Sequence, residues 1–319
     1  MFYRSIKKLI IAAMFFSFFA LSLLVIPSIT REAQATTLPL GDAGAYAVLF
    51  TGGGSNNQLS VTNVTINGNV GVGGDGIVKF NGPGDVNGRL DFSSAPFSGQ
   101  YSNTNGSNGG PSSVNYSVSA VTTALNTVDS LNSSLAGLGN NLVINTQQSG
   151  TQTVDESAGL HETINGVAYS IFNVTSYQAN NGQMLTIVGD GTGDPVVFNF
   201  GSGIGNVNLG GDVTLSGLGD DQILWNFTSS GDNVQLNNNA SSYPSLAFQG
   251  DILAPNDSIS LTNANLDGRV LGGDSHNLQI VSGAVIDSPL SPSVPEPCTM
   301  LLFGSGLVGL VALRKKIRV

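Results

Sequence analysis

Short stretches in which polar and apolar residues alternate recur through the second half of the chain. Residues 195–200 (PVVFNF) match residues 222–227 (QILWNF) 27 positions later. A shorter unit recurs at 206–209 (NVNL), 233–236 (NVQL), 258–261 (SISL) and 277–280 (NLQI). Alternation is typical of a strand with one buried face. A strand that recurs every 19 to 27 residues predicts a right-handed parallel β-solenoid, whose coils share one core. A β-sandwich with similar strands is the alternative.

The first half of the chain shows the same kind of pattern less regularly. Residues 61–70 (VTNVTINGNV) predict two strands joined by a turn at Asn67 and Gly68, and residues 85–90 predict another strand. Residues 98–113 are mostly Ser, Gly and Asn, which predicts a surface loop. Three further apolar segments predict strands that lead into the repeats: 142–144, 167–174 and 184–188.

One segment has the periodicity of a helix, because its apolar residues are spaced three or four positions apart. The spacing predicts a helix over residues 114–136, with Ser112 or Ser113 as its N-cap and Gly137 at its end. This helix is expected to cover an apolar flank of the strands, since a coiled coil with a partner would need more heptads and more charge. The apolar stripe is Val114, Val118, Val121, Leu125, Val128, Leu131 and Leu135.

The N-terminus has the pattern of a targeting segment. Basic residues open the chain, an apolar run follows from residue 9 to 26, and Ala33-Gln34-Ala35 fits a small-x-small cleavage site. Together these predict a Sec signal peptide over residues 1–35 that is cut between Ala35 and Thr36. The alternative is an uncleaved membrane anchor, since the apolar run is long.

The C-terminus predicts three further segments after a body of residues 36–288. Residues 289–298 are rich in proline and predict an extended linker. Residues 299–313 are apolar and predict a short transmembrane helix, although a full span takes about 20 residues. Residues 314–319 are basic and predict a cytoplasmic tail, so the body is expected outside the membrane.

These C-terminal elements together resemble the PEP-CTERM sorting signal. The motif is Val294-Pro295-Glu296-Pro297, and the basic stop is Arg314-Lys315-Lys316. The resemblance implies a Gram-negative bacterium, export through Sec and a precursor anchored transiently in the inner membrane. It also implies an exosortase that processes the motif and leaves the protein at the cell surface or outside the cell. Cys298 follows the motif and need not carry a role, because family sequences vary after the second proline. Lipidation of Cys298 is an alternative, although no lipobox-like leader supports it.

The body is similar to the adhesive choice-of-anchor A domain. The similarity is carried by residues 40–50, by 172–174 (FNV), by 195–200, and by 250–256 (GDILAPN) followed by 266–270 (LDGRV). It implies an adhesive domain whose members carry assorted surface anchors. More distantly, the body resembles the ice-binding β-solenoid proteins, and this resemblance implies a helix packed along the stack.

Charge separates the body from the ends of the chain. Of the 21 acidic residues, 19 lie in the body, which holds three basic residues, Lys79, Arg89 and Arg269, and therefore carries a net charge of −16. Such a surface is expected to repel nucleic acid and anionic membranes. The single cysteine excludes an internal disulfide.

No motif of a catalytic, cofactor or metal site is found. His161 and Glu162 follow Asp155 and Glu156 in a predicted solvated loop, and His276 lies in a predicted turn. H-E-x-x-H, G-x-S-x-G and phosphate-loop patterns do not occur. Aspartates in predicted turns leave Ca²⁺ binding open, but ordinary Asp turn chemistry explains them. These aspartates are Asp190, Asp194, Asp212, Asp220, Asp221, Asp232 and Asp257.

Aromatic residues fall on or near the predicted strands and are expected to stack in the core rather than to form a sugar-binding platform. Trp225 and Phe227 alternate, which fits one buried face. The other members of this set are Tyr46, Phe198, Phe200 and Phe248.

The sequence predicts an exported, non-enzymatic protein with a structural or adhesive role in the envelope or an exopolysaccharide (biofilm) matrix. One alternative is ice binding, for which a regular row of Thr is expected, yet the four aligned units carry Asn, Gln and Ser outward. The other alternative is a β-helix carbohydrate-active enzyme, which the few Lys, Arg and His residues of the body disfavour.

Overall fold

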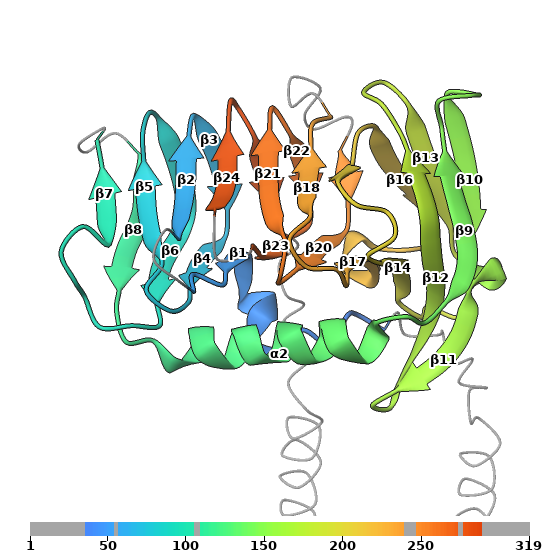
Figure 1. Cartoon of the computed structure of the whole chain (residues 1–319), viewed down its shortest axis with the longest axis horizontal. Helices are drawn as coiled ribbons and strands as arrows, with labels where there is room; N and C mark the ends of the chain where they lie inside the picture. Colours follow the sequence, from blue (N-terminus) through green and yellow to red (C-terminus); the bar gives the residue numbers. More distant parts are fainter. Residues whose placement is uncertain (1–35, 54–56, 105–108, 239–246, 274–276, 289–319) are drawn as a thin grey trace, which may run out of the picture. The chain divides into compact units, whose positions relative to one another are not determined.

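The computed structural model describes residues 36–53, 57–104, 109–238, 247–273 and 277–288. These residues form a body of mostly parallel strands with one long helix beside them (Figure 1). The predicted signal peptide (1–35) and the predicted linker, transmembrane helix and basic tail (289–319) lie outside the described residues.

The largest sheet has 15 strands. In spatial order they are β11 (Leu160–Ile164), β12 (Val167–Gln178), β14 (Val196–Phe200), β17 (Ile223–Phe227), β20 (Asp251–Ala254), β23 (Val270–Gly272), β1 (Tyr46–Phe50), β4 (Asn69–Val72), β6 (Gly84–Phe92), β3 (Val64–Asn67), β25 (Val285–Asp287), β22 (Asn265–Asp267) and β19 (Phe248–Gln249). Two strands branch from this path: β8 (Gly110–Asn115) pairs with β6, and β9 (Asn140–Asn145) pairs with β12.

This sheet bends within β6, which pairs with β3 through its first residues and with β4 through its last. Gly88 lies between the two halves of β6. A Cβ atom on Gly88 would lie 2.3 Å from the carbonyl oxygen of Gly68, so a side chain does not fit. One sheet can therefore form two sides of the body.

A second sheet has seven strands, and a third has three. The seven are β15 (Val207–Asn208), β18 (Asn233–Leu236), β21 (Ser258–Thr262), β24 (Asn277–Val281), β2 (Gln58–Thr62), β5 (Ile77–Phe80) and β7 (Tyr101–Asn103), in spatial order. The three are β10 (Thr151–Asp155), β13 (Met184–Val188) and β16 (Asp212–Ser216). Short 3₁₀ turns occur at η1 (Gly41–Ala45), η2 (Glu156–Ala158) and η3 (Asp220–Gln222).

The strand registers confirm the sequence repeats. Phe198 pairs with Trp225 in parallel, which is the 27-residue offset read from the sequence. Val207, Val234, Ile259 and Leu278 pair successively across β15, β18, β21 and β24, so the four short units stack as aligned. The pairing excludes the β-sandwich alternative, because the stacked strands are parallel.

The order of stacking does not follow the order of the chain. β23, β24 and β25 pair with β1, β2 and β3 respectively, so the last coil lies against the first. From there β4 to β8 extend the stack to one end, and the helix returns the chain to the other end (Figure 1). The strands from β9 onward then fill the stack back to its middle.

Aromatic residues stack inside the coils, as predicted. The Phe198 and Trp225 rings are stacked with centroids 4.5 Å apart, and Phe200 stacks on Phe227 at 4.5 Å. Phe248 packs against Trp225 at 4.7 Å, and the indole nitrogen of Trp225 donates to the carbonyl of Gln249. Tyr46 is an exception, because it is buried in the separate cluster beneath the helix.

The helix α2 (Ser119–Leu135) covers the outer side of β14, β17, β20, β23 and β1. Its buried residues Val121, Val128 and Leu135 belong to one cluster with outward-facing strand residues such as Leu224 and Leu253. These strands thus bury both faces, which explains why 196–200 and 223–227 are nearly continuously apolar. Each fully buried Val or Leu contributes about 1.5–3 kcal/mol.

A buried chain of three amides joins the helix to the sheet. Asn132 donates to the side chain of Asn226 and to the carbonyl of Phe227, each at 2.7 Å. Asn226 donates to Asn199, which in turn donates to the carbonyl of Leu135 at 2.6 Å. The last of these bonds satisfies the carbonyl of Leu135 at the C-terminal end of α2, where carbonyl groups lack partners within the helix.

The helix is shorter than predicted. Val114, Ser112 and Ser113 lie in β8, and Val118 occupies the N-cap in an extended conformation without a side-chain cap. Val114 continues the helical spacing by chance, because it packs against the solenoid core from β8. The predicted caps at Ser112 or Ser113 are therefore wrong.

Two further predictions are corrected. Residues 61–70 form no hairpin, since β2, β3 and β4 pair with strands of neighbouring coils rather than with one another. A two-residue hairpin lies instead at Asn165-Gly166, which joins β11 to β12. Among the described strands, β11 and β12 are the pair that runs antiparallel. The segment 98–113 is no continuous loop, because it contains β7 and the start of β8.

Candidate functional site

The outward face of the seven-stranded sheet carries a continuous row of polar side chains. The strand registers align its members, and we call it the amide row. In spatial order it is Asn208, Gln235, Ser260, Gln279, Ser60, Lys79 and Ser102. All seven residues are exposed or half-buried. Seven strands at about 4.8 Å spacing give a row about 29 Å long.

The amide row is held in place by an apolar row one position away along each strand. Its members are buried and pair in the same parallel register: Val207, Val234, Ile259, Leu278, Leu59 and Val78. Because successive side chains of a strand point to opposite faces, fixing this inner row fixes the direction of the outer row. The local alternation of the sequence therefore builds the surface directly.

The seven-stranded sheet is almost free of charge. Lys79 is the single charged residue within its seven strands. Every acidic residue in the described strands lies in the other two sheets, for example Asp85, Asp155, Asp267 and Asp287. In a body with a net charge of −16, the sheet offers amide and hydroxyl groups without the cost of desolvating carboxylates.

Several aspartates hold turns, as the sequence predicted. The carboxylate of Asp155 accepts from the backbone nitrogen of Ser157 at 2.9 Å, and that of Asp190 accepts from Thr192 at 2.8 Å. These bonds, together with those from the hydroxyls of Ser157 and Thr192, lower the pKa of both carboxyls. Asp257 is buried and accepts from the backbone nitrogen of Asp232 at 3.0 Å.

Within the described residues, no three His, Cys, Asp or Glu side chains come together in a group that could hold a metal ion. His276 lies outside the described residues.

The region around His161 is solvent-exposed, as predicted, but it is a strand and not a loop. His161 and Glu162 lie in β11, and the imidazole Nε2 is 3.9 Å from a carboxylate oxygen of Asp190. Glu156 is fully buried and accepts from the backbone nitrogen of Asp190 at 2.9 Å. Burial raises the pKa of Glu156, but its contacts are to the loop that it holds in place.

A buried ion pair and an acidic cluster lie elsewhere, and the sequence did not predict them. Arg269 and Asp251 are both buried, with nitrogen and oxygen 3.2 Å apart. Burial raises the pKa of Asp251 to about 6, while Arg269 acts in the opposite direction. Burial, the adjacent Asp220 and then Asp287 raise the pKa of Asp267 to about 7. Parallel pairing of Asp267 with Asp287 brings these carboxyls together.

The three-stranded sheet carries a short threonine row that the sequence analysis missed. Thr153, Thr186 and Thr214 pair in successive register, and the hydroxyls of Thr186 and Thr214 are 3.1 Å apart. The unequal spacing of these residues along the chain hides the row. Only the parallel registers reveal it.

The predicted processing residues fall mostly outside the described residues. These are Ala33 and Ala35 at the signal cleavage site, Val294 to Pro297 in the sorting motif, Cys298, and Arg314 to Lys316. Thr36 is described, and its backbone nitrogen donates to the carbonyl of Gly193 at 2.8 Å. Among the described residues, no helix has the length and apolarity needed to cross a membrane.

Comparison with solved structures finds ice-binding proteins. One from the Antarctic ascomycete Antarctomyces psychrotrophicus is 15% identical, with 80% of this chain and 100% of that chain covered and a TM-score of 0.49. The antifreeze protein LeIBP from an Arctic yeast is 18% identical, with coverages of 83% and 98% and a TM-score of 0.49. One from an Antarctic biological consortium is 18% identical, with coverages of 80% and 92% and a TM-score of 0.48. No curated protein matches the chain.

Two family models match the chain. Residues 293–316 match the PEP-CTERM protein-sorting motif, which indicates an exported protein that an exosortase processes. Residues 31–281 match the model described as "Putative Ice-binding-like adhesive domain". This second match spans most of the chain, and the chain therefore belongs to the ice-binding-like adhesive domain family.

Proposed function

We propose that this protein is an exported adhesin that binds neutral polysaccharide of the extracellular matrix through the amide row. The observation that carries the proposal is the outward face of the seven-stranded sheet, on which one row of polar groups repeats in register and Lys79 is the single charged member. The sheet offers amide donors and acceptors at Gln235 and Gln279 and hydroxyls at Ser60 and Ser260. The proposal includes no catalytic step and no bound cofactor.

A long row of weak hydrogen bonds suits an extended polymer. Each contact exchanges a bond to water for a bond to the ligand and contributes little alone. Several contacts on one polymer act together, because each raises the effective concentration of the next. Burying a carboxylate against a neutral polymer would cost free energy, so a face with one charged residue supports a neutral partner.

The route to the matrix is part of the proposal. A signal peptide of residues 1–35 is cleaved before Thr36, and residues 289–298, 299–313 and 314–319 act as linker, short transmembrane helix and cytoplasmic tail. The exosortase then releases the body of residues 36–288 from the inner membrane to the surface of a Gram-negative cell. Within the body we propose right-handed coils, which parallel crossover connections strongly favour.

The test is retention of the purified protein on insoluble cellulose and dextran, compared with alginate as a charged polymer. We expect binding to the neutral polymers. The double variant Gln235→Glu/Gln279→Glu places two carboxylates on the amide row and is expected to lose most of this binding. Gln147→Glu is the matched control, because Gln147 is exposed in the turn between β9 and β10. Equal retention of the double variant and the wild type would refute the role of the amide row.

Ice binding is the second candidate, and the threonine row is the observation that favours it. Thr153, Thr186 and Thr214 present hydroxyls at the spacing of adjacent strands. An ice-recrystallisation assay with Thr186→Asn tests it. Inhibition by the wild type that the variant lacks would support ice binding through this row, whereas no inhibition by the wild type would exclude it.

A further inference from the structure

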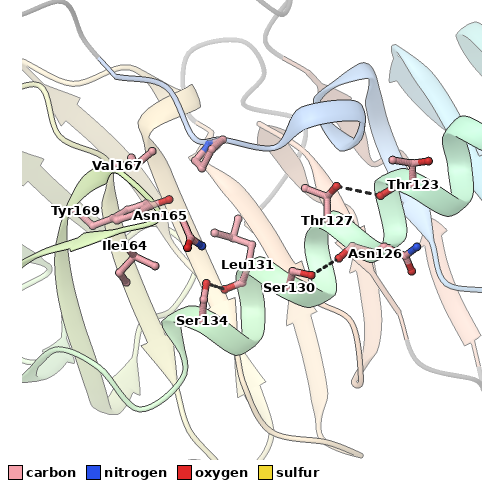
Figure 2. A pocket seen from close by; sticks show the side chains of 11 residues that line it. Thr123, Asn126, Thr127, Ser130, Leu131, Ser134, Ile164, Asn165, Val167 and Tyr169 are labelled. Carbon is pink, nitrogen blue, oxygen red and sulfur yellow. Dashed lines mark hydrogen bonds between the residues drawn. The ribbon is translucent and has the colours of Figure 1, made fainter.

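A groove of about 390 Å³ lies between α2 and the β11–β12 hairpin (Figure 2). None of its lining residues belongs to the seven-stranded sheet, so it is separate from the amide row. One wall is formed by polar residues of α2, and Figure 2 shows Ile164, Val167 and Tyr169 on the opposite side. Its volume lies within the range of small-molecule sites.

The helix wall presents hydrogen-bond acceptors. Thr127 donates its hydroxyl hydrogen to the carbonyl of Thr123 at 3.0 Å, and Ser130 donates to Asn126 at 2.8 Å. Each hydroxyl has one hydrogen, so these oxygens offer only lone pairs to the groove. A ligand can therefore donate to these two oxygens, while the exposed side-chain amide of Asn126 on the same wall can both donate and accept.

Tyr169 offers the complementary group from the other side. It is 1% exposed and lines the groove, yet its hydroxyl has no hydrogen-bond partner among the described residues. Burial raises the pKa of Tyr169 to about 12, so the hydroxyl stays protonated and can donate. The oxygen is not among the fully buried atoms that lack a partner, so the hydroxyl is accessible from the groove and a ligand acceptor can take its hydrogen bond.

The hairpin holds this side of the groove rigid. Ile164 pairs with Val167, and Asn165 and Gly166 between them have φ of 53° and 84°. Positive φ at both positions is the signature of a two-residue type I′ turn, whose twist matches the flanking strands. The turn fixes Asn165 at the groove, where its amide can both donate and accept.

We propose that this groove binds a neutral saccharide of one or two sugar units. No lining residue is charged, which favours a neutral ligand. Sugar hydroxyls both donate and accept, so they match the helix oxygens and Tyr169 together, while Leu131, Ile164 and Val167 face the carbon skeleton. An extended peptide would bind by pairing with a free strand edge. Because β11 is the terminal strand of the largest sheet, the test below includes a peptide as a competing ligand. The inference does not depend on the amide row.

Calorimetric titration of the full-length protein tests the site with cellobiose, maltose and N,N′-diacetylchitobiose, and with digalacturonate as a charged comparison. We expect millimolar binding of at least one neutral disaccharide and weaker binding of digalacturonate. Tyr169→Phe keeps the ring and removes the hydroxyl, and we expect about 5- to 10-fold weaker binding from the lost hydrogen bond. Ser130→Ala should weaken binding, whereas Ser133→Ala, on the exposed side of the same helix, should not.

The following outcomes would contradict saccharide binding in the groove. Failure of all three neutral disaccharides to bind at about 10 mM would overturn the proposal. So would unchanged binding by Tyr169→Phe, or tighter binding of a Gly-Ser tetrapeptide than of any sugar. If Gln235→Glu/Gln279→Glu abolishes disaccharide binding while Tyr169→Phe does not, the sugar binds the amide row. The groove proposal then fails and the proposed function stands.

Discussion

Leu59 and Leu278 come from the second and the next-to-last strands of the body, and they pair in parallel register. Both side chains are fully buried in the core. The pair joins the first coil of the chain to the last, so the stack is continuous only when both ends of the body are present. A repeat protein wound in chain order would have independent ends.

Leu278→Ala should destabilise the whole body rather than one end of it. Removing a buried leucine typically costs about 2–5 kcal/mol, and here the cavity opens between the first and last coils. Val281→Ala, on the half-buried side of the same strand, should cost less. Chemical denaturation measures both changes. Hydrogen exchange should show β2 and β5 losing protection together with β24, and loss confined to β24 would contradict a shared core.

The sequence predicted the strands well because their signal is local. Alternation fixes which side chains face inward, and the 27-residue match places Phe198 beside Trp225 as observed. The sequence could not predict that β23 lies beside β1, because pairing between coils that are far apart in the chain leaves no local pattern. The helix start was wrong for a related reason, since Val114 has helical spacing but belongs to a strand.

The amide row could be predicted in part. The four aligned units showed Asn, Gln and Ser facing outward, but Ser60, Lys79 and Ser102 join the row only through the closure of the stack. The groove at Tyr169 left no signal, because it forms where a helix meets a hairpin from another part of the chain. The Asn165-Gly166 hairpin was predictable from its dipeptide, since Asn-Gly favours such turns.

Asn132→Ala should weaken the attachment of α2. The substitution leaves the buried Asn226 side chain and the Phe227 carbonyl without the donor that both now share. An unsatisfied buried polar group costs about 1–3 kcal/mol. Ser133→Ala, at the neighbouring exposed position, is the control and should change stability little. Denaturation curves that place both variants within error of the wild type would contradict a structural role for the amide chain.

Gly88→Ala should disrupt the bend in the largest sheet. The added Cβ atom would lie 2.3 Å from the Gly68 carbonyl oxygen, so the backbone of one strand must move. Gly53→Ala is the comparison, because no atom lies within 4 Å of the added Cβ. We expect a clear fall in the melting temperature of Gly88→Ala and little change in that of Gly53→Ala. Crystal structures of the wild type and of Gly88→Ala that show the same bend at β6 would mean that the site tolerates a side chain.

Stability should fall as the pH rises from about 5 to 8. The pKa of Asp267 is raised to about 7 and that of Asp251 to about 6, both well above the usual value of 3.8. The folded state therefore binds more protons than the unfolded state between these values. The stabilisation is fully present below pH 3.8 and is lost as the pH passes 6 to 7. Beyond burial, Asp220 and Asp287 raise the pKa of Asp267, while Arg269 lowers and Asp220 raises that of Asp251. The pKa of nearby Asp221 is itself raised by burial and then by Asp220.

Melting temperatures measured across this range check the direction. Asp267→Asn keeps a neutral group beside Asp220 and should flatten the dependence. Asp75→Asn, at an exposed turn, should leave it as in the wild type. A melting temperature that rises from pH 5 to 8 would contradict the shifted carboxyls.

Processing at both ends should leave a chain that begins at Thr36 and lacks the basic tail. Cleavage after Ala35 keeps the Thr36 nitrogen available to donate to the carbonyl of Gly193 at 2.8 Å, and the backbone nitrogen of Leu38 donates to the carbonyl of Asp221 at 3.1 Å. A cut beyond Leu38 would remove both bonds and expose the buried Leu38 site in the cluster beneath α2. Intact-mass analysis of the protein from its native host measures both ends. Retention of Arg314 to Lys316 would exclude exosortase processing, and a first residue after Leu38 would exclude the predicted signal cleavage.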